Sequence, residues 1–371
     1  MKSLNPNFIP IAEPTLGKEE EELVLDALRS GWISSTGKYI QTFEEEFAKF
    51  CGVKYAITTS NGTAALHLCL VAANIGPGDE VIVPSMTFVA TANVVSYTGA
   101  KPIFVDSEKE TWNIDPDEIK EQINSRTKAI IPVHLYGNPA NMGTVLAIAK
   151  KYGLVVIEDA AEAHGAMYKQ KKVGSLGNMG CFSFFGNKII TTGEGGMITT
   201  NNKDLVEKIR MYRDHGYSKK RRYYYPRIGF NYRMTNLQAA IGLAQVRKIE
   251  NIIKRKREIA MLYSKLLDLL CPQISLQPEA SWAKNVYWMY SILINRYSKK
   301  NRDGVINELK KRGIDSRPFF FPLHKLPQYK TGENLPVSEM LGSCGINLPS
   351  SVTLTDNKIE FICDNIKEIL A

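Results

Sequence analysis

The sequence predicts an α/β fold in which a mainly parallel sheet forms a large domain and a smaller α+β domain follows it. Apolar β-rich runs alternate with helical patterns from about residue 54 to residue 200, as in sheets covered on both faces. With 371 residues, of which 44% are hydrophobic, the chain can bury a large core. We assign residues 1–250 to the large domain and residues 251–371 to a linking helix and the small domain.

The strands of the large domain are predicted at residues 55–58, 80–84, 101–105, 129–133, 154–158, 180–184 and 196–199. Helical patterns lie before or between them at residues 18–30, 63–73, 87–97, 116–123 and 142–152, most of them followed by a glycine. A helical pattern from residue 236 into residue 270 predicts the linking helix. The small domain is then predicted to hold a strand at 286–294, a helix at 300–312, a proline-rich loop at 317–327 and a terminal helix at 356–370.

Composition narrows the class of protein. The six cysteines show no paired spacing, so we expect neither a metal site nor structural disulfides. The first residues lack a signal pattern and no apolar run approaches the length of a membrane span, so we expect a cytoplasmic protein without membrane contact. The net charge of +9 favours anionic partners, without choosing between nucleic acid, a membrane surface and a phosphorylated small molecule.

Lys188 lies between an apolar run and a glycine cluster in the stretch FSFFGNKIITTGEGG, residues 182–196. A lysine becomes a nucleophile when its surroundings favour the neutral amine, and burial among apolar side chains does so. Such a lysine can form a Schiff base with a carbonyl compound or with pyridoxal 5'-phosphate (PLP). The alternative is a solvated lysine with no special role, but the upstream sequence holds the other parts of a PLP site.

Five other residues match the needs of that cofactor. Asp159 follows a strand and would keep the ring nitrogen protonated, although Asp at a strand end is also a common turn former. Gly62 and Thr63 open a helix whose amides would bind the phosphate, with the Ser183 hydroxyl as a further donor. Phe88, at another strand end, would stack on the ring. Taken together, these positions predict one cofactor site at the carboxyl edge of the sheet.

These residues also carry a family resemblance. The stretches SNGTAALHL, PSMTFVATAN, VIEDAAEAHG, FSFFGNKIITTGEGGM and GFNYRMTNLQAAIGLAQ make nearly the whole chain similar to the DegT/DnrJ/EryC1/StrS family of PLP-dependent nucleotide-sugar aminotransferases. The resemblance implies the fold of fold-type I PLP aminotransferases. It also implies amino transfer from L-glutamate, because Lys188 is retained where family members that dehydrate deoxysugars carry histidine.

Carried onto this sequence, the resemblance makes Lys188 both the residue that binds the cofactor and the acid/base, with Asp159 as the partner of the ring nitrogen. It places Glu162 near the phenolic oxygen of the cofactor. Asn231 would reach the phosphate from the neighbouring subunit, which implies an obligate homodimer with shared active sites.

The stretches SGWISSTGKYIQTFE, PVHLYGNPANM, VYWMYSIL and SRPFFFPLHKLPQY look most like family members that act at C4 of GDP-4-keto-6-deoxymannose. The alternative substrate is a UDP- or dTDP-linked 4-keto-6-deoxy sugar. The candidate substrate contacts, each of which has the alternative of a structural loop role, are Trp32, Ser34, Ser35, Arg221, Arg222, Arg317 and His324.

A basic and aromatic cluster, residues 219–225, leaves one remote alternative open. Its sequence KKRRYYY interleaves cations with rings in the way that nucleic-acid contacts do, and the alternatives for this cluster are a solvated loop and a contact to the diphosphate of a nucleotide sugar. On that interpretation the protein would be a non-enzymatic nucleic-acid-binding protein without a cofactor. The PLP-site residues favour the enzyme.

Overall fold

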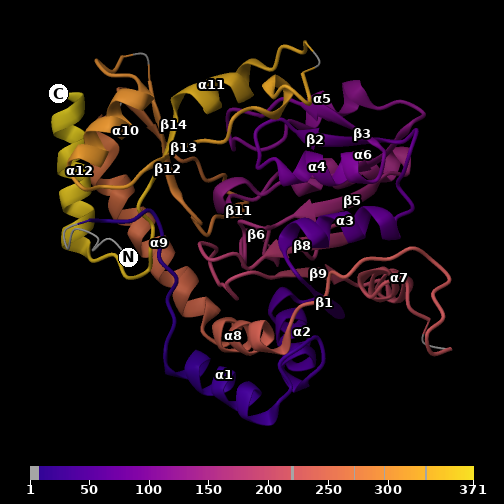
Figure 1. Ribbon diagram of the computed structural model, residues 1–371. Coiled ribbons are helices and arrows are strands. Elements are labelled where there is room, and N and C mark those ends of the chain that lie inside the picture. The colour runs from indigo at the N-terminus through magenta and orange to yellow at the C-terminus, as the bar shows by residue number, and fades with distance from the viewer. Residues whose placement is uncertain (1–7, 219–220, 271, 296, 331) are drawn as a thin grey trace.

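A seven-stranded sheet forms the centre of the large domain (Figure 1). The computed structural model describes residues 8–218, 221–270, 272–295, 297–330 and 332–371. The strands are β1 (Tyr55–Thr59), β2 (Glu80–Pro84), β3 (Lys101–Val105), β4 (Thr127–Ile130), β5 (Val155–Asp159), β8 (Met179–Ser183) and β9 (Gly196–Thr200), in the order β1-β9-β8-β5-β4-β2-β3. Only β9 runs antiparallel to its neighbours in this sheet, so the predicted mainly parallel sheet is confirmed.

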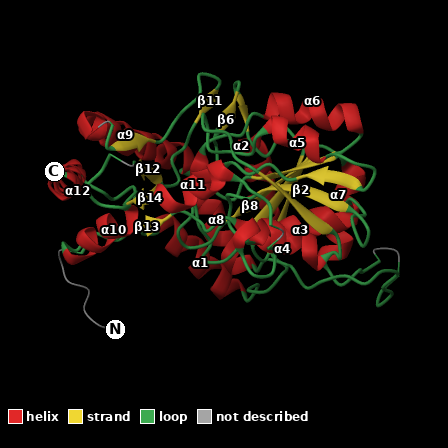
Figure 2. Ribbon diagram, turned by 90° about the horizontal axis from the view of Figure 1, so that it is seen from above, coloured by secondary structure: helices red, strands yellow, loops and turns green. Residues whose placement is uncertain are grey.

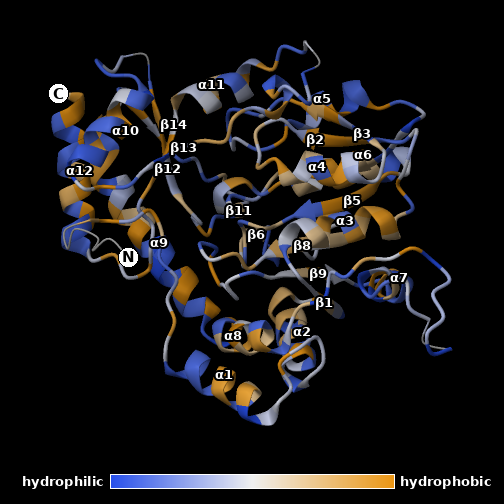
Figure 3. Cartoon of the chain, viewed as in Figure 1, coloured by the Kyte–Doolittle hydropathy of each residue, from blue (hydrophilic) through white to orange (hydrophobic). Residues whose placement is uncertain are grey.

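Helices cover both faces of this sheet (Figure 2). On one face lie α3 (Gly62–Ala72) and α4 (Ala90–Tyr97), and on the other α5 (Pro116–Gln122) and α6 (Met142–Tyr152). Apolar side chains therefore occur on both faces of the strands, and Figure 3 shows β2 as mostly hydrophobic. Every residue of β2 is buried, and Val81 and Val83 belong to one core while Ile82 belongs to the other. This alternation is the two-residue period of a strand.

Three helices pack together below the sheet in the view of Figure 1: α1 (Lys18–Ser30), α2 (Lys38–Cys51) and α8 (Asn236–Arg247). We did not predict α2 from the sequence, nor α7 (Lys203–Arg213), which packs against α3. The signal for α2 was present, because Phe43, Phe47 and Cys51 follow one another at four-residue spacing and are all buried.

The small domain is a four-stranded antiparallel sheet with helices packed against it. Its strands are β10 (Ile274–Leu276), β12 (Tyr290–Ile294), β13 (Arg317–Pro318) and β14 (Gly345–Leu348), and its helices are α10 (Arg302–Lys311), α11 (Pro336–Cys344) and α12 (Asp356–Leu370). Ile9 bridges to Ile314 and belongs to the core of this domain. The N-terminal segment therefore contributes to the small domain, while the boundary at residue 250 stays a prediction.

The predicted single linking helix is wrong in one respect. The chain forms two helices, α8 and α9 (Ile249–Leu267), which meet at Lys248, and a 3₁₀ turn η2 (Asp268–Leu270) follows. The physical reason is that the two helices bury different faces: α8 packs against α1 and α2, and α9 packs against α12. One straight helix could not satisfy both.

Short elements complete the chain. A small three-stranded sheet contains β6 (Met167–Tyr168), β7 (Lys171–Lys172) and β11 (Ala283–Lys284), and two further 3₁₀ turns are η1 (Leu135–Gly137) and η3 (Leu323–Lys325). β11 brings a segment that precedes the small domain's central strand against the large domain. No helix among the described residues is long and apolar enough to cross a membrane.

Candidate active site

A cavity of about 850 Å³ lies where the carboxyl ends of the parallel strands meet the small domain. Open α/β sheets bind ligands at this edge, and the volume suits a cofactor together with a substrate. Eight of the predicted site residues line it: Gly62, Thr63, Phe88, Asp159, Glu162, Ser183, Lys188 and Arg317. Residues that are far apart in sequence thus meet at one place.

Lys188 is almost enclosed, with 12% of its side chain exposed. It follows β8 in a tight turn, in which its own N–H donates to Phe185 O at 2.9 Å. Its Nζ lies 3.7 Å from Glu162 Oε1 and 3.8 Å from the centre of the Trp288 ring. Burial lowers the pKa of the Lys188 amine, although Glu162 and Asp159 favour the charged form. The amine is therefore closer to the neutral, nucleophilic state than an exposed lysine.

Asp159 ends β5, and its carboxylate is buried at the floor of the cavity. Oδ2 accepts a hydrogen bond from Thr91 Oγ1 at 2.8 Å, and Oδ1 accepts one from Ala161 N at 3.2 Å. Burial raises the pKa of this carboxyl, while the two donors and Lys188 oppose the shift. A cationic ring nitrogen placed against Asp159 would offset the cost of burying the carboxylate.

Glu162 faces Lys188 with one oxygen and the chain with the other. Its Oε2 accepts the backbone N–H of Tyr136 at 2.8 Å. Tyr136 has a φ of 52°, a left-handed conformation that is rare for an aromatic residue, and this conformation aims its amide at Glu162. Burial raises the pKa of Glu162 to about 7, with the Lys188 charge opposing the shift.

The start of α3 forms a cradle for an anion. The Asn61 side chain caps the helix by accepting from Ala64 N at 2.8 Å, and Gly62 and Thr63 face the cavity in the first turn. A Cβ on Gly62 would lie 2.8 Å from Ser183 Cβ, so only glycine lets the helix start approach β8 this closely. This cradle, the buried Asp159 and the enclosed Lys188 fit the phosphate, ring nitrogen and carbonyl carbon of PLP.

Aromatic side chains from both domains form one wall of the cavity. Tyr136 stacks on Phe320 at 5.4 Å and on Trp288 at 6.1 Å between ring centres. Phe88 is half-exposed at the mouth and contacts Phe320 at 5.8 Å, which leaves one of its faces available to a flat ligand. Phe319 completes this wall.

Several predicted residues lie outside this cavity. Trp32 and Ser34 are exposed and hold Asn236 through their carbonyl oxygens, and Ser35 lines a second cavity of about 680 Å³ beside α2 and α7. Asn231 is exposed on the segment that follows α7, where it forms a bridge to Asp214.

The basic and aromatic cluster is an exposed loop. The Arg221 guanidinium stacks on Tyr224 and that of Arg222 on Tyr223, at 5.4 and 5.0 Å from the ring centres. Lys219 and Lys220 lie outside the described residues.

The assignment of His324 as a substrate contact requires correction. Its ring is buried, with Nδ1 2.6 Å from Ser85 Oγ and Nε2 3.2 Å from Glu339 Oε1. Both ring nitrogens are thus occupied within the protein, and His324 does not line the cavity. It ties the proline-rich loop to the end of β2, a structural role.

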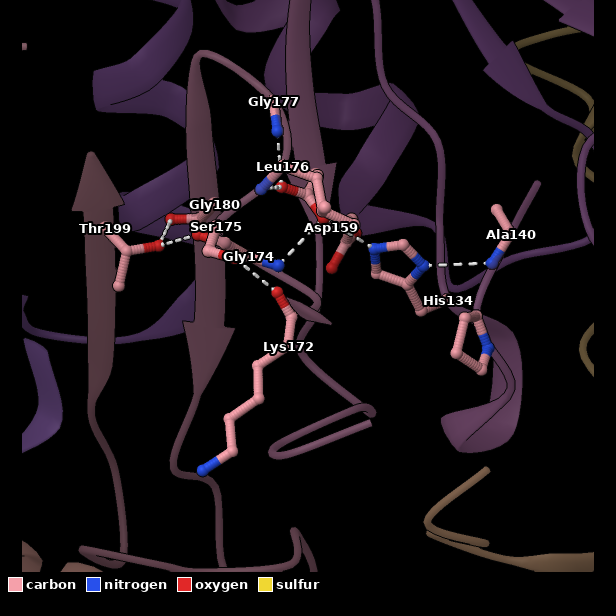
Figure 4. A network of polar contacts seen from close by, with 12 residues as sticks. His134, Ala140, Asp159, Lys172, Gly174, Ser175, Leu176, Gly177, Gly180 and Thr199 are labelled. Carbon is pink, nitrogen blue, oxygen red and sulfur yellow. Dashed lines mark hydrogen bonds and ion pairs between the residues drawn. The ribbon is translucent and has the colours of Figure 1, made fainter. Parts of the chain in front are cut away.

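A buried carboxylate next to Asp159 anchors the end of β5. Glu158 accepts backbone N–H groups from Gly174, Leu176 and Gly177 at 2.7 to 2.8 Å, and it bonds to His134 Nε2 at 3.1 Å. Figure 4 shows these donors, with His134 bonded in turn to Ala140. Because the Ala140 N–H can only donate, His134 Nδ1 carries no proton, so His134 is neutral with its proton on Nε2. The network holds the strand that presents Asp159.

Sequence reasoning missed Thr91, Tyr136 and Trp288. Thr91 stands in PSMTFVATAN, one of the stretches that carried the family resemblance, and Tyr136 and Trp288 stand in PVHLYGNPANM and VYWMYSIL, which pointed to the substrate. These stretches were the signal available, but no role was assigned to the three residues. No arrangement of three or more His, Cys, Asp or Glu side chains suited to a metal occurs within the described ranges.

The comparisons with known proteins agree with this geometry. The pattern of the DegT/DnrJ/EryC1/StrS aminotransferase family matches residues 14–367. The chain is 47% identical over 364 residues to a GDP-perosamine synthase of Caulobacter vibrioides, covering 98% of each chain. It is also 47% identical over 362 residues to a GDP-perosamine synthase of Escherichia coli O157:H7, covering 97% of this chain and 98% of the relative.

A solved structure adds the cofactor. The Streptococcus pneumoniae protein Spr1654, solved in a PLP form and a PMP form, superposes with TM-scores of 0.91 and 0.92 at 28% identity. Both forms cover 98% of this chain, and 98% and 97% of their own chains respectively. These matches confirm the predicted fold, the enzyme over the nucleic-acid-binding alternative, and the cofactor. The chain belongs to the DegT/DnrJ/EryC1/StrS aminotransferase family and is a PLP-dependent sugar aminotransferase.

Proposed function

We propose that this enzyme transfers the amino group of L-glutamate to C4 of GDP-4-keto-6-deoxymannose, giving GDP-perosamine and 2-oxoglutarate. The observation that carries the chemistry is the enclosed Lys188 amine facing Glu162 at 3.7 Å, in one cavity with Asp159. The sugar is inferred from the two relatives that are named GDP-perosamine synthase and match almost the whole chain. We further propose a cytoplasmic enzyme.

Lys188 acts twice in this proposal. It binds the cofactor covalently at rest, and when its amine is free it moves protons. In the first half of the reaction it takes the proton from the α-carbon of glutamate, and in the second half it delivers a proton to C4 of the sugar. PLP, when bound, supplies the electron sink that makes these carbon–hydrogen bonds labile. The lowered pKa of Lys188 suits this work near neutral pH.

The other residues of the site would hold and orient the cofactor. Asp159, kept in place by Thr91 and Ala161, retains the proton on the ring nitrogen of the cofactor. Gly62, Thr63 and Ser183 bind the phosphate at the start of α3. Phe88 and Glu162 line the same cavity, where Phe88 would cover the ring and Glu162 would lie near its phenolic oxygen.

The active site is completed by a second subunit in this proposal. Asn231 lies outside its own cavity, whereas its neighbour Tyr232 lines it, so the segment that carries both passes along the rim. We infer that Asn231 reaches the phosphate of the partner's site in a homodimer, the symmetry most common among homo-oligomers.

Arg317 is the positively charged residue that this subunit itself contributes to substrate binding. It lines the cavity, its side chain is 63% exposed, and its nearest carboxylate, Asp315, is 3.6 Å away. It is therefore available to an anionic group such as a diphosphate or the carboxylate of glutamate. Trp32, Ser34, Ser35, Arg221 and Arg222 would contact substrate only from the partner subunit.

The test supplies the purified enzyme with L-glutamate and the 4-keto-6-deoxy sugar linked to GDP, UDP or dTDP, and measures 2-oxoglutarate and the amino sugar by mass spectrometry. The proposal expects the GDP-linked sugar to be converted fastest. Preference for the UDP- or dTDP-linked sugar would overturn the nucleotide assignment and leave the amino transfer intact.

A pair of variants tests the lysine. Lys188→Ala should lose amino transfer by at least about 10²-fold, because among the described residues Lys188 is the one lysine that lines the cavity and could move the proton. Lys151→Ala, which changes an exposed lysine on α6, should retain it. Full activity in Lys188→Ala would refute the central assignment.

A further inference from the structure

Trp288 lies directly against the reactive amine. The Lys188 Nζ is 3.8 Å from the centre of its ring, and the indole is buried. Among aromatic rings, indole attracts an ammonium group most strongly, and exclusion of water strengthens the attraction. The proposed reaction assigns no task to this contact.

Trp288 is held through its ring and through its backbone. Its Nε1–H donates to the carbonyl oxygen of Asn187, the residue before Lys188, at 2.7 Å. The Trp288 carbonyl oxygen accepts from Lys256 Nζ at 2.9 Å, and the same Nζ donates to Ser350 O at 2.7 Å. Trp288 therefore connects the cofactor-binding turn of the large domain to α9.

Lys256 is an unusual residue to find in this position. It is buried in α9, and burial lowers the pKa of its amine to about 7. Its two hydrogen-bond acceptors among the described residues are carbonyl oxygens. A methionine of similar shape would pack there without the cost of burying an amine. What lysine adds over methionine is its N–H groups, which donate to the two carbonyl oxygens.

We propose that the Trp288 indole is the resting site of the Lys188 amine whenever that amine is not bonded to the cofactor, and that Lys256 is the positioning residue that holds the indole there. The inference rests on the proposed role of Lys188. The first half of the reaction frees the amine and the second half recaptures it, so a resting site inside the cavity keeps its effective concentration high while it is free.

Other charged and titratable groups face the same amine. Glu162 lies at 3.7 Å, and Glu162 and Asp159 both favour the ammonium form. His164 is neutral, because burial lowers its pKa to about 3. The indole, like the two carboxylates, favours the charged form of the Lys188 amine, whereas burial favours the neutral form. Loss of its π face should therefore shift Lys188 toward the neutral amine.

The test measures the titration of Lys188 itself. One sample is treated with excess L-glutamate, which leaves the Lys188 amine free. A second sample is stripped of cofactor, so that the titration of Lys188 can be measured even in a variant that does not turn over. Each sample is labelled with acetic anhydride across a pH series, and the peptide containing Lys188 is quantified by mass spectrometry.

Trp288→Leu should increase the neutral fraction of Lys188 by about fivefold or more at a fixed pH below its pKa, since a cation–π contact is worth about 1 kcal/mol at an exposed site and more where water is excluded. Trp288→Phe keeps a ring face and should stay within about twofold of the parent enzyme. Trp282→Leu is the matched control, because Trp282 packs against Tyr168 with the ring centres 5.0 Å apart and does not line the cavity.

Lys256→Met and Lys256→Gln test the positioning role, with thermal unfolding recorded to show that each variant is folded. Lys256→Met should move the Lys188 titration in the same direction as Trp288→Leu, and Lys256→Gln, which keeps a donor, should move it less. An unchanged titration in Trp288→Leu overturns the resting site. A shift in Trp288→Leu but in neither folded Lys256 variant overturns the positioning role. Both outcomes are independent of whether the GDP-linked sugar is a substrate.

Discussion

Glu162 Oε1 lies 3.7 Å from Lys188 Nζ inside a cavity that hides almost all of both side chains. Burial acts on the two groups in opposite directions: it raises the pKa of the carboxyl and lowers the pKa of the amine. The charge on either one depends on the charge on the other. Glu162 is thereby a means of controlling the amine that performs the chemistry.

Glu162→Gln should change the pH dependence of amino transfer. The wild-type carboxyl, with a pKa of about 7, is neutral below that pH and negative above it, where it favours the ammonium form of Lys188. The amide imitates the neutral carboxyl at every pH. We therefore expect the rates of Glu162→Gln and the wild type to converge below pH 7 and to diverge above it, in profiles of kcat/KM against pH.

Glu194→Gln is the control for that profile, because Glu194 is an exposed carboxylate on the same cavity. It should leave the profile unchanged. If Glu162→Gln kept the wild-type change in kcat/KM near pH 7, that change would arise from the titration of another group.

Asp159→Asn should separate stability from function. Burial raises the pKa of Asp159 in the folded protein, so its contribution to stability is present at low pH and is lost as the pH rises through that raised value. The amide never ionises. Cofactor-free Asp159→Asn should therefore exceed the wild type in unfolding free energy at pH 8, by on the order of 1 kcal/mol, with the difference vanishing below about pH 4.

The same variant should lose amino transfer by about 10²-fold or more, because the charge that holds the ring proton is gone. Urea unfolding across the pH range checks the stability, and the glutamate half-reaction checks the activity. A variant less stable than the wild type at pH 8 would mean that the Thr91 and Ala161 bonds outweigh the burial of the charge.

Gly62→Ala should weaken cofactor binding. The added Cβ would stand 2.8 Å from Ser183 Cβ, so the start of α3 must move away from β8 and the phosphate cradle must widen. We expect the dissociation constant for PLP to rise by about tenfold or more, equivalent to about 1.4 kcal/mol, in a titration followed by absorbance. Gly76→Ala, whose nearest new neighbour is Thr98 O at 3.8 Å, should bind as the wild type does. Equal affinities for the two variants would place the phosphate elsewhere.

Glu158→Gln should destabilise the large domain. The carboxylate accepts three backbone N–H groups and the His134 Nε2–H, and an amide turns one of its two oxygens into a donor that faces another donor. We expect a loss of about 2–4 kcal/mol in the free energy of unfolding, measured by urea denaturation. Glu360→Gln, on the exposed side of α12, should cost almost nothing. A small loss in Glu158→Gln would show that the loop at residues 174–177 is held by other contacts.

The residues of the site that could be predicted all have a local signature. Gly62 begins a helix and Asp159 ends a strand, and both positions can be read from the surrounding sequence. The topology of parallel strands then brings such positions to one edge of the sheet, so their proximity follows from their order. Phe88 and Lys188 were found in the same way.

Other features depend on contacts between distant parts of the chain. Trp288 reads as one apolar residue in a strand pattern, and only the packing of the small domain places its ring on Lys188. His324 reads as a polar residue in a loop, and only its burial against Ser85 reveals a structural role. The break between α8 and α9 at Lys248 likewise follows from the two surfaces that these helices must cover.

The sequence by itself determined the mainly parallel sheet, the reactive lysine with its carboxylate and phosphate partners, and the family. Hydrophobic periodicity, glycine positions and strand ends are local, and they act before the chain is compact. The tertiary structure decided the state of the amine, because desolvation and the contacts with Glu162 and Trp288 exist only after the two domains have packed together.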